Sequence, residues 1–247
     1  MDELARNRLR TLLTVDDMVR EITELLEKKG ALESTYFIYT SDHGFHMGQF
    51  CLGACKRQPY ENDLRVPMYM RGPGIKAGQR VEGLMGIPDI APTILALTGV
   101  DPSPLKFDGK SVLPLLQKVE MSQKVVLDTG MNHVTFNTST WRDAWLVEYL
   151  ATEPDVKYDN FGHVVDNSNN TFRGLRLVSE GRDLAYFEFT DDYKDWDFVQ
   201  PSFHELYDVK EDPYQTRNIY KQASTELKAE LAKRLIEQTK CAGDSCA

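Results

Sequence analysis

The chain has 247 residues, of which 41% are hydrophobic and 27% charged, proportions that exclude a disordered or collagen-like protein. Acidic residues outnumber basic residues 38 to 29, and the net charge of −9 argues against a general nucleic-acid or acidic-membrane binder. No apolar run approaches the roughly 20 residues of a membrane span, and the N-terminus shows no apolar core of a secretory signal. The length suits one large domain or two small ones.

The first hundred residues alternate between helical and strand-like patterns. Residues 4–29 carry apolar side chains at spacings of three and four, which predicts an amphipathic helix. A β-branched and aromatic run over 34–40 follows and predicts a buried strand, and residues 66–70 predict a short edge strand. A helix that leads directly into a buried strand is typical of an α/β unit with a parallel sheet. Residues 89–97 predict a further helix, capped by Asp89.

After about residue 120 the pattern changes to an antiparallel meander. Strand-like runs separated by polar turns cover residues 125–127, 144–149, 172–178, 184–189 and 204–208. Residues 224–240 then repeat leucine every four positions, with acidic residues early and basic residues late, as an amphipathic helix prefers. We therefore expect an α/β part over residues 1–120 and a small antiparallel sheet with a helix over residues 121–247.

Acidic, histidine and lysine side chains that can carry chemistry follow the predicted strand over 34–40. Asp42, His43 and His46 come directly after it, and open α/β sheets bind ligands outside the carboxyl ends of their strands. An acid and two histidines at this place can bind a metal or transfer protons. Lys56, in an irregular loop, can hold an anion as a point charge. The structural alternatives stay open: a turn capped by Asp42, hydrogen-bonded histidines and a solvated lysine.

The four cysteines form two close pairs, and neither pair has the C-x₂-C spacing of common zinc sites. In the C-terminal pair, a flexible Gly-Asp-Ser centre lets Cys241 and Cys246 close a small ring, so we expect a disulfide there. Two free thiols are the alternative. Asn137 and Asn169 begin N-glycosylation sequons, a pattern that also arises by chance. The disulfide and the sequons together favour a secretory compartment.

Eight segments together carry a resemblance to a known family: in chain order, residues 40–50, 56–61, 66–67, 71–75, 89–95, 108–111, 205–208 and 212–214. They resemble the type I sulfatases, and within them the N-acetylglucosamine-6-sulfatases and extracellular heparan sulfatases. The resemblance implies an α/β domain of alkaline-phosphatase type, of which this chain is the C-terminal portion. It also implies a small C-terminal domain in which an antiparallel sheet packs on a helix.

Matched residue by residue, the resemblance implies that Asp42 and His43 are ligands of a calcium ion and that Lys56 contacts the sulfate. His46 lies beside this site and is a candidate to touch the sugar or the leaving oxygen. Many relatives have Asn at the position of His43, and calcium prefers oxygen ligands, so His43 is the less typical ligand. The resemblance implies a sulfuric ester hydrolase acting on sulfated glucosamine or glycosaminoglycan, in the lysosome or outside the cell.

The family nucleophile is a formylglycine made from the cysteine of a Cys-x-Pro/Ala-x-Arg motif. Cys51 begins Cys-Leu-Gly-Ala-Cys and Cys55 begins Cys-Lys-Arg-Gln-Pro, so neither fits the motif. We therefore expect this chain to be the C-terminal half of a sulfatase and to be inactive alone. Two alternatives are a non-catalytic protein that binds sulfated glycans and a phosphohydrolase of the same fold. The residue at the nucleophile position would discriminate among the three.

Overall fold

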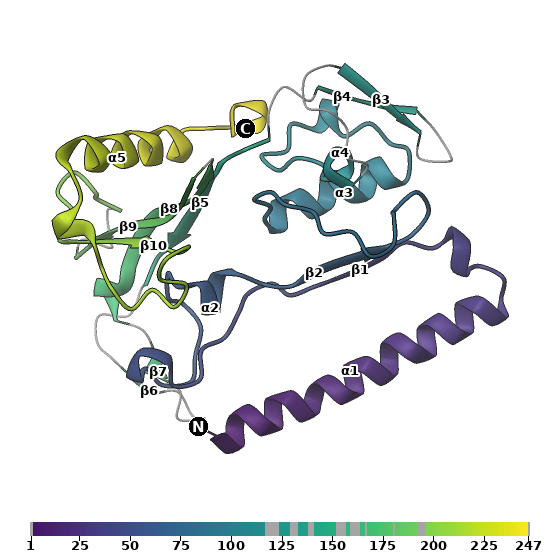
Figure 1. Ribbon diagram of the computed structural model, residues 1–247, viewed down its shortest axis with the longest axis horizontal. Helices are drawn as coiled ribbons and strands as arrows, with labels where there is room; N and C mark the ends of the chain where they lie inside the picture. Colours follow the sequence, from purple (N-terminus) through teal and green to yellow (C-terminus); the bar gives the residue numbers. More distant parts are fainter. Residues whose placement is uncertain are drawn as a thin grey trace.

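The computed structural model describes residues 2–116, 124–128, 133–137, 141–151, 157–158, 164–165, 167–179, 181–191 and 196–246. Two groups of elements lie side by side (Figure 1). One contains the strands β1 (Phe37–Thr40) and β2 (Met68–Arg71) with the short helices α3 (Ile90–Leu97) and α4 (Leu113–Leu116). The other contains a four-stranded sheet covered by helix α5 (Thr225–Thr239). Among the described residues, no helix has both the length and the apolarity needed to cross a bilayer.

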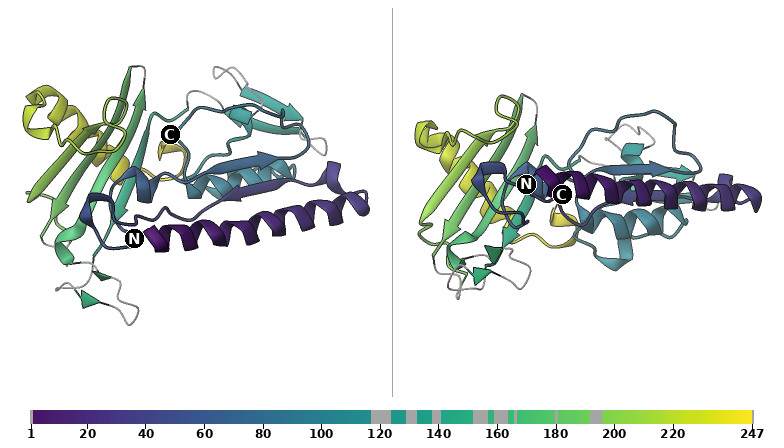
Figure 2. Two further views of the ribbon diagram at one scale, coloured as in Figure 1. Left: turned by 60° about the horizontal axis from the view of Figure 1, so that its bottom comes forward. Right: turned by 90° about the horizontal axis from the view of Figure 1, so that it is seen from below.

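Helix α1 (Asp2–Lys28) confirms the helix predicted over residues 4–29. It runs along the outside of the molecule, next to the β1–β2 pair (Figure 2). No residue of α1 is buried, and Leu12 and Ile22 on its apolar stripe are each 48% exposed. The Arg8 guanidinium donates to the Phe45 carbonyl at 3.1 Å near the start of the helix. The apolar stripe is therefore largely uncovered in this chain.

Strands β1 (Phe37–Thr40) and β2 (Met68–Arg71) confirm the two strands predicted in the first part. They pair antiparallel, with Phe37 opposite Arg71 and Thr40 opposite Met68. The predicted parallel sheet is therefore wrong for the described residues. The predicted burial of the first strand is also wrong, because every residue of β1 is half-buried or exposed. Strand direction and burial depend on which segments pair and pack, and a local pattern of side chains does not encode this.

The core beneath β1 and β2 is formed by α3 (Ile90–Leu97) and α4 (Leu113–Leu116). Its buried apolar residues are Ala96, Leu97, Val112, Leu113 and Leu116. They pack against half-buried side chains of the strand pair, including Ile38 and Met70. Helix α3 confirms the helix predicted over residues 89–97.

Asp89 lies directly before α3 and is fully buried. Its side chain makes no capping bond to α3, so the predicted cap is wrong. Its Oδ2 instead accepts from the backbone N–H of Gly86 at 3.0 Å and from Nη1 of Arg142 at 2.6 Å. Its Oδ1 accepts from the backbone N–H of Lys110 at 2.7 Å. Asp89 therefore joins three separate segments rather than one helix end.

The C-terminal sheet has the order β10-β9-β8-β5, and all its pairs are antiparallel, as the meander pattern predicted. Its strands are β5 (Ala144–Tyr149), β8 (Thr171–Ser179), β9 (Arg182–Thr190) and β10 (Phe203–Asp208). Two further pairs stand apart from it: β3 (Lys124–Asp128) with β4 (His133–Asn137), and β6 (Lys157–Tyr158) with β7 (Val164–Val165). The strand predicted over residues 125–127 is thus present but belongs to a separate hairpin.

Both faces of the four-stranded sheet are covered. On one face, α5 (Thr225–Thr239) packs Leu231 and Leu235 against a cluster that includes Leu175, Tyr186 and Leu206. Helix α5 begins after Ser224, whose hydroxyl accepts from the backbone N–H of Leu227, a typical N-cap.

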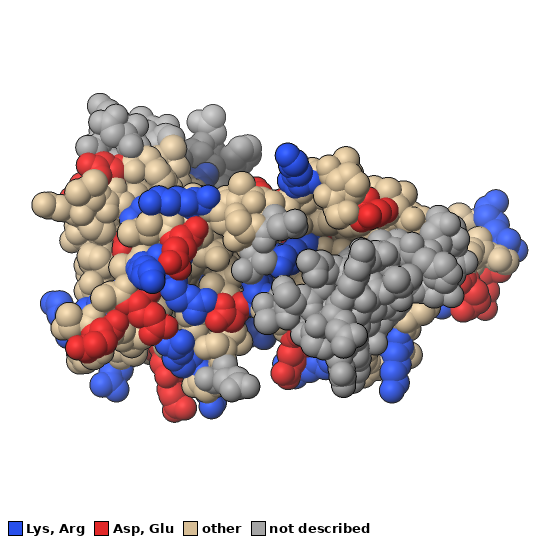
Figure 3. All heavy atoms as spheres, turned by 90° about the horizontal axis from the view of Figure 1, so that it is seen from above, with Lys and Arg blue, Asp and Glu red and all other residues tan. Residues whose placement is uncertain are grey.

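Acidic and basic side chains interleave over the side of the molecule where α5 lies (Figure 3).

The opposite face of the sheet presents aromatic side chains, among them Phe172, Phe187 and Tyr207. Tyr60 and Leu64, from the first part of the chain, pack against these rings. The segment that follows Lys56 is therefore seated directly on the C-terminal sheet.

The predicted disulfide between Cys241 and Cys246 is present. It closes the turn η7 (Gly243–Cys246), and the backbone N–H of Gly243 donates to Asp108 at 2.7 Å. Of the two predicted glycosylation sites, Asn169 is exposed in the turn η5 (Ser168–Asn170). Asn137 ends β4, and the rest of its sequon lies outside the described residues.

Candidate functional site

Strand β1 ends at Thr40, and a tight turn then brings the chain against the segment around residue 62. The Gly44 N–H donates to the Asp63 carbonyl at 2.8 Å, and the Phe45 N–H donates to the Asn62 carbonyl at 3.0 Å. A Cβ atom at residue 44 would lie 1.9 Å from the Asn62 oxygen, so this approach requires glycine. The turn that carries Asp42 and His43 is thereby fixed on its C-terminal side.

The structure brings Asp42, His43 and Lys56 together at this turn. The Nε2 atom of His43 lies 3.3 Å from Asp42 Oδ2 and 2.5 Å from Lys56 Nζ. The His43 Nδ1 atom lies 2.7 Å from the Gly44 carbonyl oxygen. A carbonyl can only accept, so Nδ1 donates in this contact and carries a proton. Nε2 faces both Lys56 Nζ and Asp42 Oδ2, and in the neutral ring its lone pair can ligate a cation.

Asp42 is open to solvent, with 81% of its side chain exposed. Desolvation is the largest single effect and would raise its pKa. The neighbouring His43 ring and the hydrogen bond from the His43 backbone N–H outweigh it, so the pKa of Asp42 lies below its usual value. The carboxylate is therefore ionised at neutral pH and available as a ligand.

Asp42 and His43 fit two adjacent positions in the shell of one cation. Two ligands held about 2.4 Å from a calcium ion at right angles lie about 3.4 Å apart, close to the 3.3 Å between Asp42 Oδ2 and His43 Nε2. Calcium takes about six to eight oxygen ligands. Among the described residues, no group of three or more His, Cys, Asp or Glu side chains gathers as a metal site. Asp42 and His43 alone are fewer ligands than calcium takes, so a calcium site at this turn stays a prediction.

His46 is buried, with 3% of its surface exposed. Its Nδ1 atom contacts both carboxylate oxygens of Asp63, at 2.8 and 3.0 Å. Its backbone forms an antiparallel bridge with Cys55, through bonds of 2.8 and 3.1 Å, next to Lys56. His46 therefore holds the two arms of the loop together, and its contact with a sugar or a leaving oxygen stays a prediction.

The C-terminal part of the chain contributes residues around the site that the sequence analysis did not identify. The Nδ2 amide of Asn170 donates to the Arg57 carbonyl at 2.8 Å. The backbone N–H of Glu61 donates to Gln215 at 2.7 Å. Further contacts join Tyr60 with Glu205 at 3.3 Å and Arg176 with Glu61 at 2.7 Å. These partners lie 113 to 154 residues apart in the chain, a separation at which no local pattern reports a contact.

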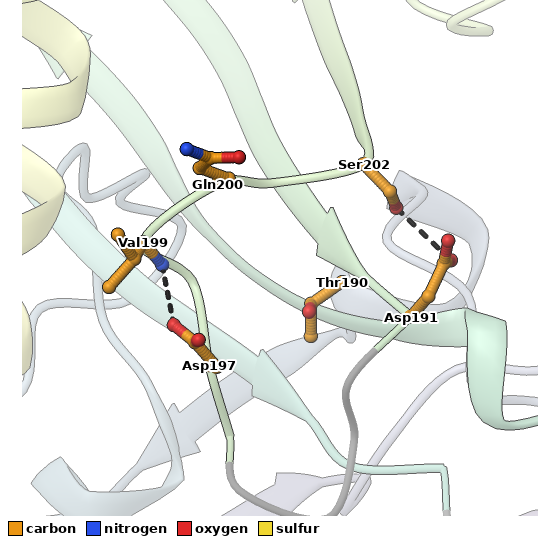
Figure 4. A pocket seen from close by; sticks show the side chains of 6 residues that line it. All are labelled: Thr190, Asp191, Asp197, Val199, Gln200 and Ser202. Atoms are coloured by element: carbon orange, nitrogen blue, oxygen red, sulfur yellow. Dashed lines mark hydrogen bonds between the residues drawn. The ribbon is translucent and has the colours of Figure 1, made fainter.

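A shallow hollow of about 320 Å³ lies elsewhere, between the ends of β9 and β10 (Figure 4). Its acidic side chains are engaged locally: Asp191 accepts from the Ser202 hydroxyl at 3.2 Å, and Asp197 accepts from the Val199 N–H at 2.8 Å. None of the predicted site residues lines it. The hollow is therefore lined by the residues of a polar turn, and it is separate from the candidate site.

Comparison with known proteins identifies the relatives of this chain. A family model described as Sulfatase matches residues 2–100. The bovine (Bos taurus) N-acetylglucosamine-6-sulfatase is 36% identical over 259 residues, covering 100% of this chain and 42% of that protein. The Drosophila melanogaster extracellular sulfatase SULF-1 homolog is 48% identical over 113 residues, covering 46% of this chain and 10% of that protein.

A solved structure supports the same assignment. BT4656, determined in complex with its substrate D-glucosamine-2-N,6-O-disulfate, superposes with a TM-score of 0.67 at 28% identity. The match covers 93% of this chain and 39% of that one. The chain thus spans less than half the length of the relatives it matches, and it aligns with their C-terminal part. Fold, motifs and alignment agree, and the chain belongs to the sulfatase family.

Proposed function

We propose that this chain supplies one half of the active site of a sulfuric ester hydrolase that acts on sulfated glucosamine or glycosaminoglycan. The observation that carries the proposal is the convergence of Asp42, His43 and Lys56 at the end of β1. A carboxylate and an imidazole suit a cation, and an adjacent ammonium suits an anion. The substrate class comes from the relatives: N-acetylglucosamine-6-sulfatases and a protein solved with a glucosamine disulfate.

In this proposal Asp42 and His43 hold a calcium ion, which, when bound, draws negative charge away from the sulfate oxygens. Lys56 Nζ lies 2.5 Å from His43 Nε2, and with a cation held at Nε2 the ammonium would be free to turn toward the sulfate. Lys56 then faces a sulfate oxygen and stabilises the charge that develops during hydrolysis. One such charged contact typically contributes roughly 3 kcal/mol to the stability of the transition state.

We further propose that the nucleophile comes from outside this sequence, because no cysteine in it begins a Cys-x-Pro/Ala-x-Arg motif. The 247-residue chain is then inactive alone and gains activity when joined to the N-terminal segment that its relatives carry. Residues 1–120 belong to the catalytic domain and residues 121–247 form the small C-terminal domain. The Cys241–Cys246 disulfide and the exposed Asn169 sequon suit a secreted or lysosomal glycoprotein.

The test compares sulfate release from glucosamine 6-sulfate by the chain alone and by the joined protein, with calcium present. Lys56→Met in the joined protein should lower kcat/KM by about two orders of magnitude. The matched control is Lys76→Met, which removes an exposed lysine and should leave kcat/KM unchanged. Turnover by the short chain alone would refute the proposed division of the site, and binding without turnover by the joined protein would indicate a sulfated-glycan-binding protein.

Calcium binding by the joined protein is tested separately by titration calorimetry. Asp42→Asn keeps the shape of the side chain but removes the charge that binds the ion. The variant should bind calcium at least about tenfold more weakly, because ligand charge sets the affinity of such sites. Unchanged affinity would remove Asp42 from the metal site.

A further inference from the structure

The backbone immediately after Lys56 is strained. Arg57 has φ of +108°, a value that residues with a side chain rarely adopt. Such conformations persist only when the surroundings hold them, and they cluster at functional sites. The strained residue is next to the lysine that the proposed function places on the sulfate.

Fixed groups hold the chain on both sides of this residue. Before Lys56, two backbone hydrogen bonds join Cys55 to the buried His46. After Arg57, the backbone N–H of Gln58 donates to the buried carboxylate of Asp63 at 2.9 Å. The Arg57 carbonyl itself is held by one side chain, since the Nδ2 amide of Asn170 donates to it at 2.8 Å.

Asn170 is itself fixed by its place in the C-terminal domain. It ends the turn η5, in which Asn167 Oδ1 accepts from the backbone N–H of Asn169 at 2.9 Å. The next residue, Thr171, is fully buried at the start of β8, and its hydroxyl accepts from the Ala151 N–H at 3.1 Å. The donor that meets the Arg57 carbonyl is therefore carried on a rigid support.

We propose that Asn170 is a positioning residue for Lys56: by holding the Arg57 carbonyl, it keeps the strained backbone in place and directs the lysine ammonium toward the sulfate site. This inference rests on the proposed function and goes beyond it, because it makes the C-terminal domain part of the sulfate-binding machinery. Without the Asn170 amide, Arg57 relaxes toward negative φ, its carbonyl turns, and Lys56 loses its alignment with His43.

The experiment uses the 247-residue chain, produced without N-glycosylation and studied with calcium present, and follows two quantities by NMR. The first is amide hydrogen exchange at Gln58, which reports the order of the loop. The second is the affinity for inorganic sulfate, followed at the Lys56 side chain. Asn170→Ala should accelerate exchange at Gln58 by about tenfold and weaken sulfate binding about threefold or more. Asn169→Ala, one residue earlier in the same turn and exposed, is the matched control and should change neither.

Asn170→Asp retains the shape of the side chain and loses the donor, so it should behave like Asn170→Ala. Asn170→Ser retains a donor and should recover part of the effect. Wild-type exchange and sulfate affinity in a folded Asn170→Asp variant would overturn the proposal, as would unfolding of both the Ala and Asp variants, which would show a general structural role. Lys56→Met separates the two proposals: undiminished sulfate binding by that variant refutes the role of Lys56, whereas exchange at Gln58 still decides the role of Asn170.

Discussion

Glu205 on β10 shows how burial changes the chemistry of a single residue at the contact between the two parts of the chain. The residue is 7% exposed, and its side chain accepts from the Tyr60 hydroxyl at 3.3 Å. Removal from water raises the pKa of Glu205 to about 7, although hydrogen bonds from Tyr207 and Tyr60 oppose the change. Because an unfolded glutamate titrates near 4.5, the folded chain retains a proton between these two values. Stability therefore falls as the pH rises through this window.

Glu205→Gln tests this dependence, since glutamine mimics the protonated form. The free energy of unfolding of the wild type, relative to that of the variant, should fall by about 3 kcal/mol as the pH rises from 4.5 to 7. Urea unfolding at a series of pH values measures it. Glu33→Gln, at an exposed position, is the control and should give a nearly constant difference. A constant difference for Glu205→Gln as well would show that Glu205 is ionised in the folded chain.

At this same scale the sequence identified the residues that converge at the turn, and it missed the residues that support them. Asp42 and His43 were found because they directly follow a predicted strand, and Lys56 was found because it begins a separate short segment, residues 56–61, that resembles the family. Asp63 and Asn170 were missed because each acts on a residue distant in the chain: 17 positions separate His46 from Asp63, and 113 separate Arg57 from Asn170. Such contacts arise from the tertiary fold.

At the scale of elements, local periodicity predicted α1, α3, α5 and the strands of the C-terminal sheet. It could not predict how β1 pairs or whether α1 is covered, because both depend on segments distant in the sequence. Helix α5 is the element whose burial agrees best with its pattern. Leu231 and Leu235 lie one turn apart, both are fully buried, and both face the sheet.

Leu231→Ala should therefore destabilise the chain by about 2–5 kcal/mol, the usual cost of a large-to-small change in a core. Leu231 is completely buried, whereas Ile236 on the same helix is 40% exposed. Ile236→Ala should cost less than about 1 kcal/mol and serves as the control. Chemical denaturation followed by circular dichroism measures both. Equal effects of the two substitutions would mean that α5 does not pack on the sheet as described.

At the scale of the whole molecule, a buried ion pair joins the two groups of elements. Arg142 directly precedes the region of β5, and Asp89 precedes α3. The Arg142 guanidinium lies 4.5 Å from the centre of the Trp145 ring and 5.1 Å from that of Trp141. The Trp141 indole N–H also donates to the Leu84 carbonyl at 2.8 Å. The pair therefore sits within an aromatic contact that spans the two parts.

Arg142→Ala should destabilise the chain by about 3–5 kcal/mol, because it leaves the fully buried Asp89 without its cation. Arg182→Ala removes a partly exposed arginine that pairs with Glu230 and should cost about 1 kcal/mol or less. Thermal unfolding compares the two. If Arg142→Ala destabilises the chain no more than Arg182→Ala does, the buried ion pair does not stabilise the contact between the two parts.

The exposed position of α1 bears on how the chain unfolds. Its 27 residues correspond to a rod of about 40 Å, long enough for a helix to persist with little tertiary support. No residue of α1 is buried, so its melting does not require the sheet or the α3 core to open. We therefore expect α1 to melt at a lower denaturant concentration than the two packed parts. Circular dichroism reports the loss of helix, and a later change in the fluorescence of Trp141 and Trp145, which lie at the junction of the two parts, would confirm the order.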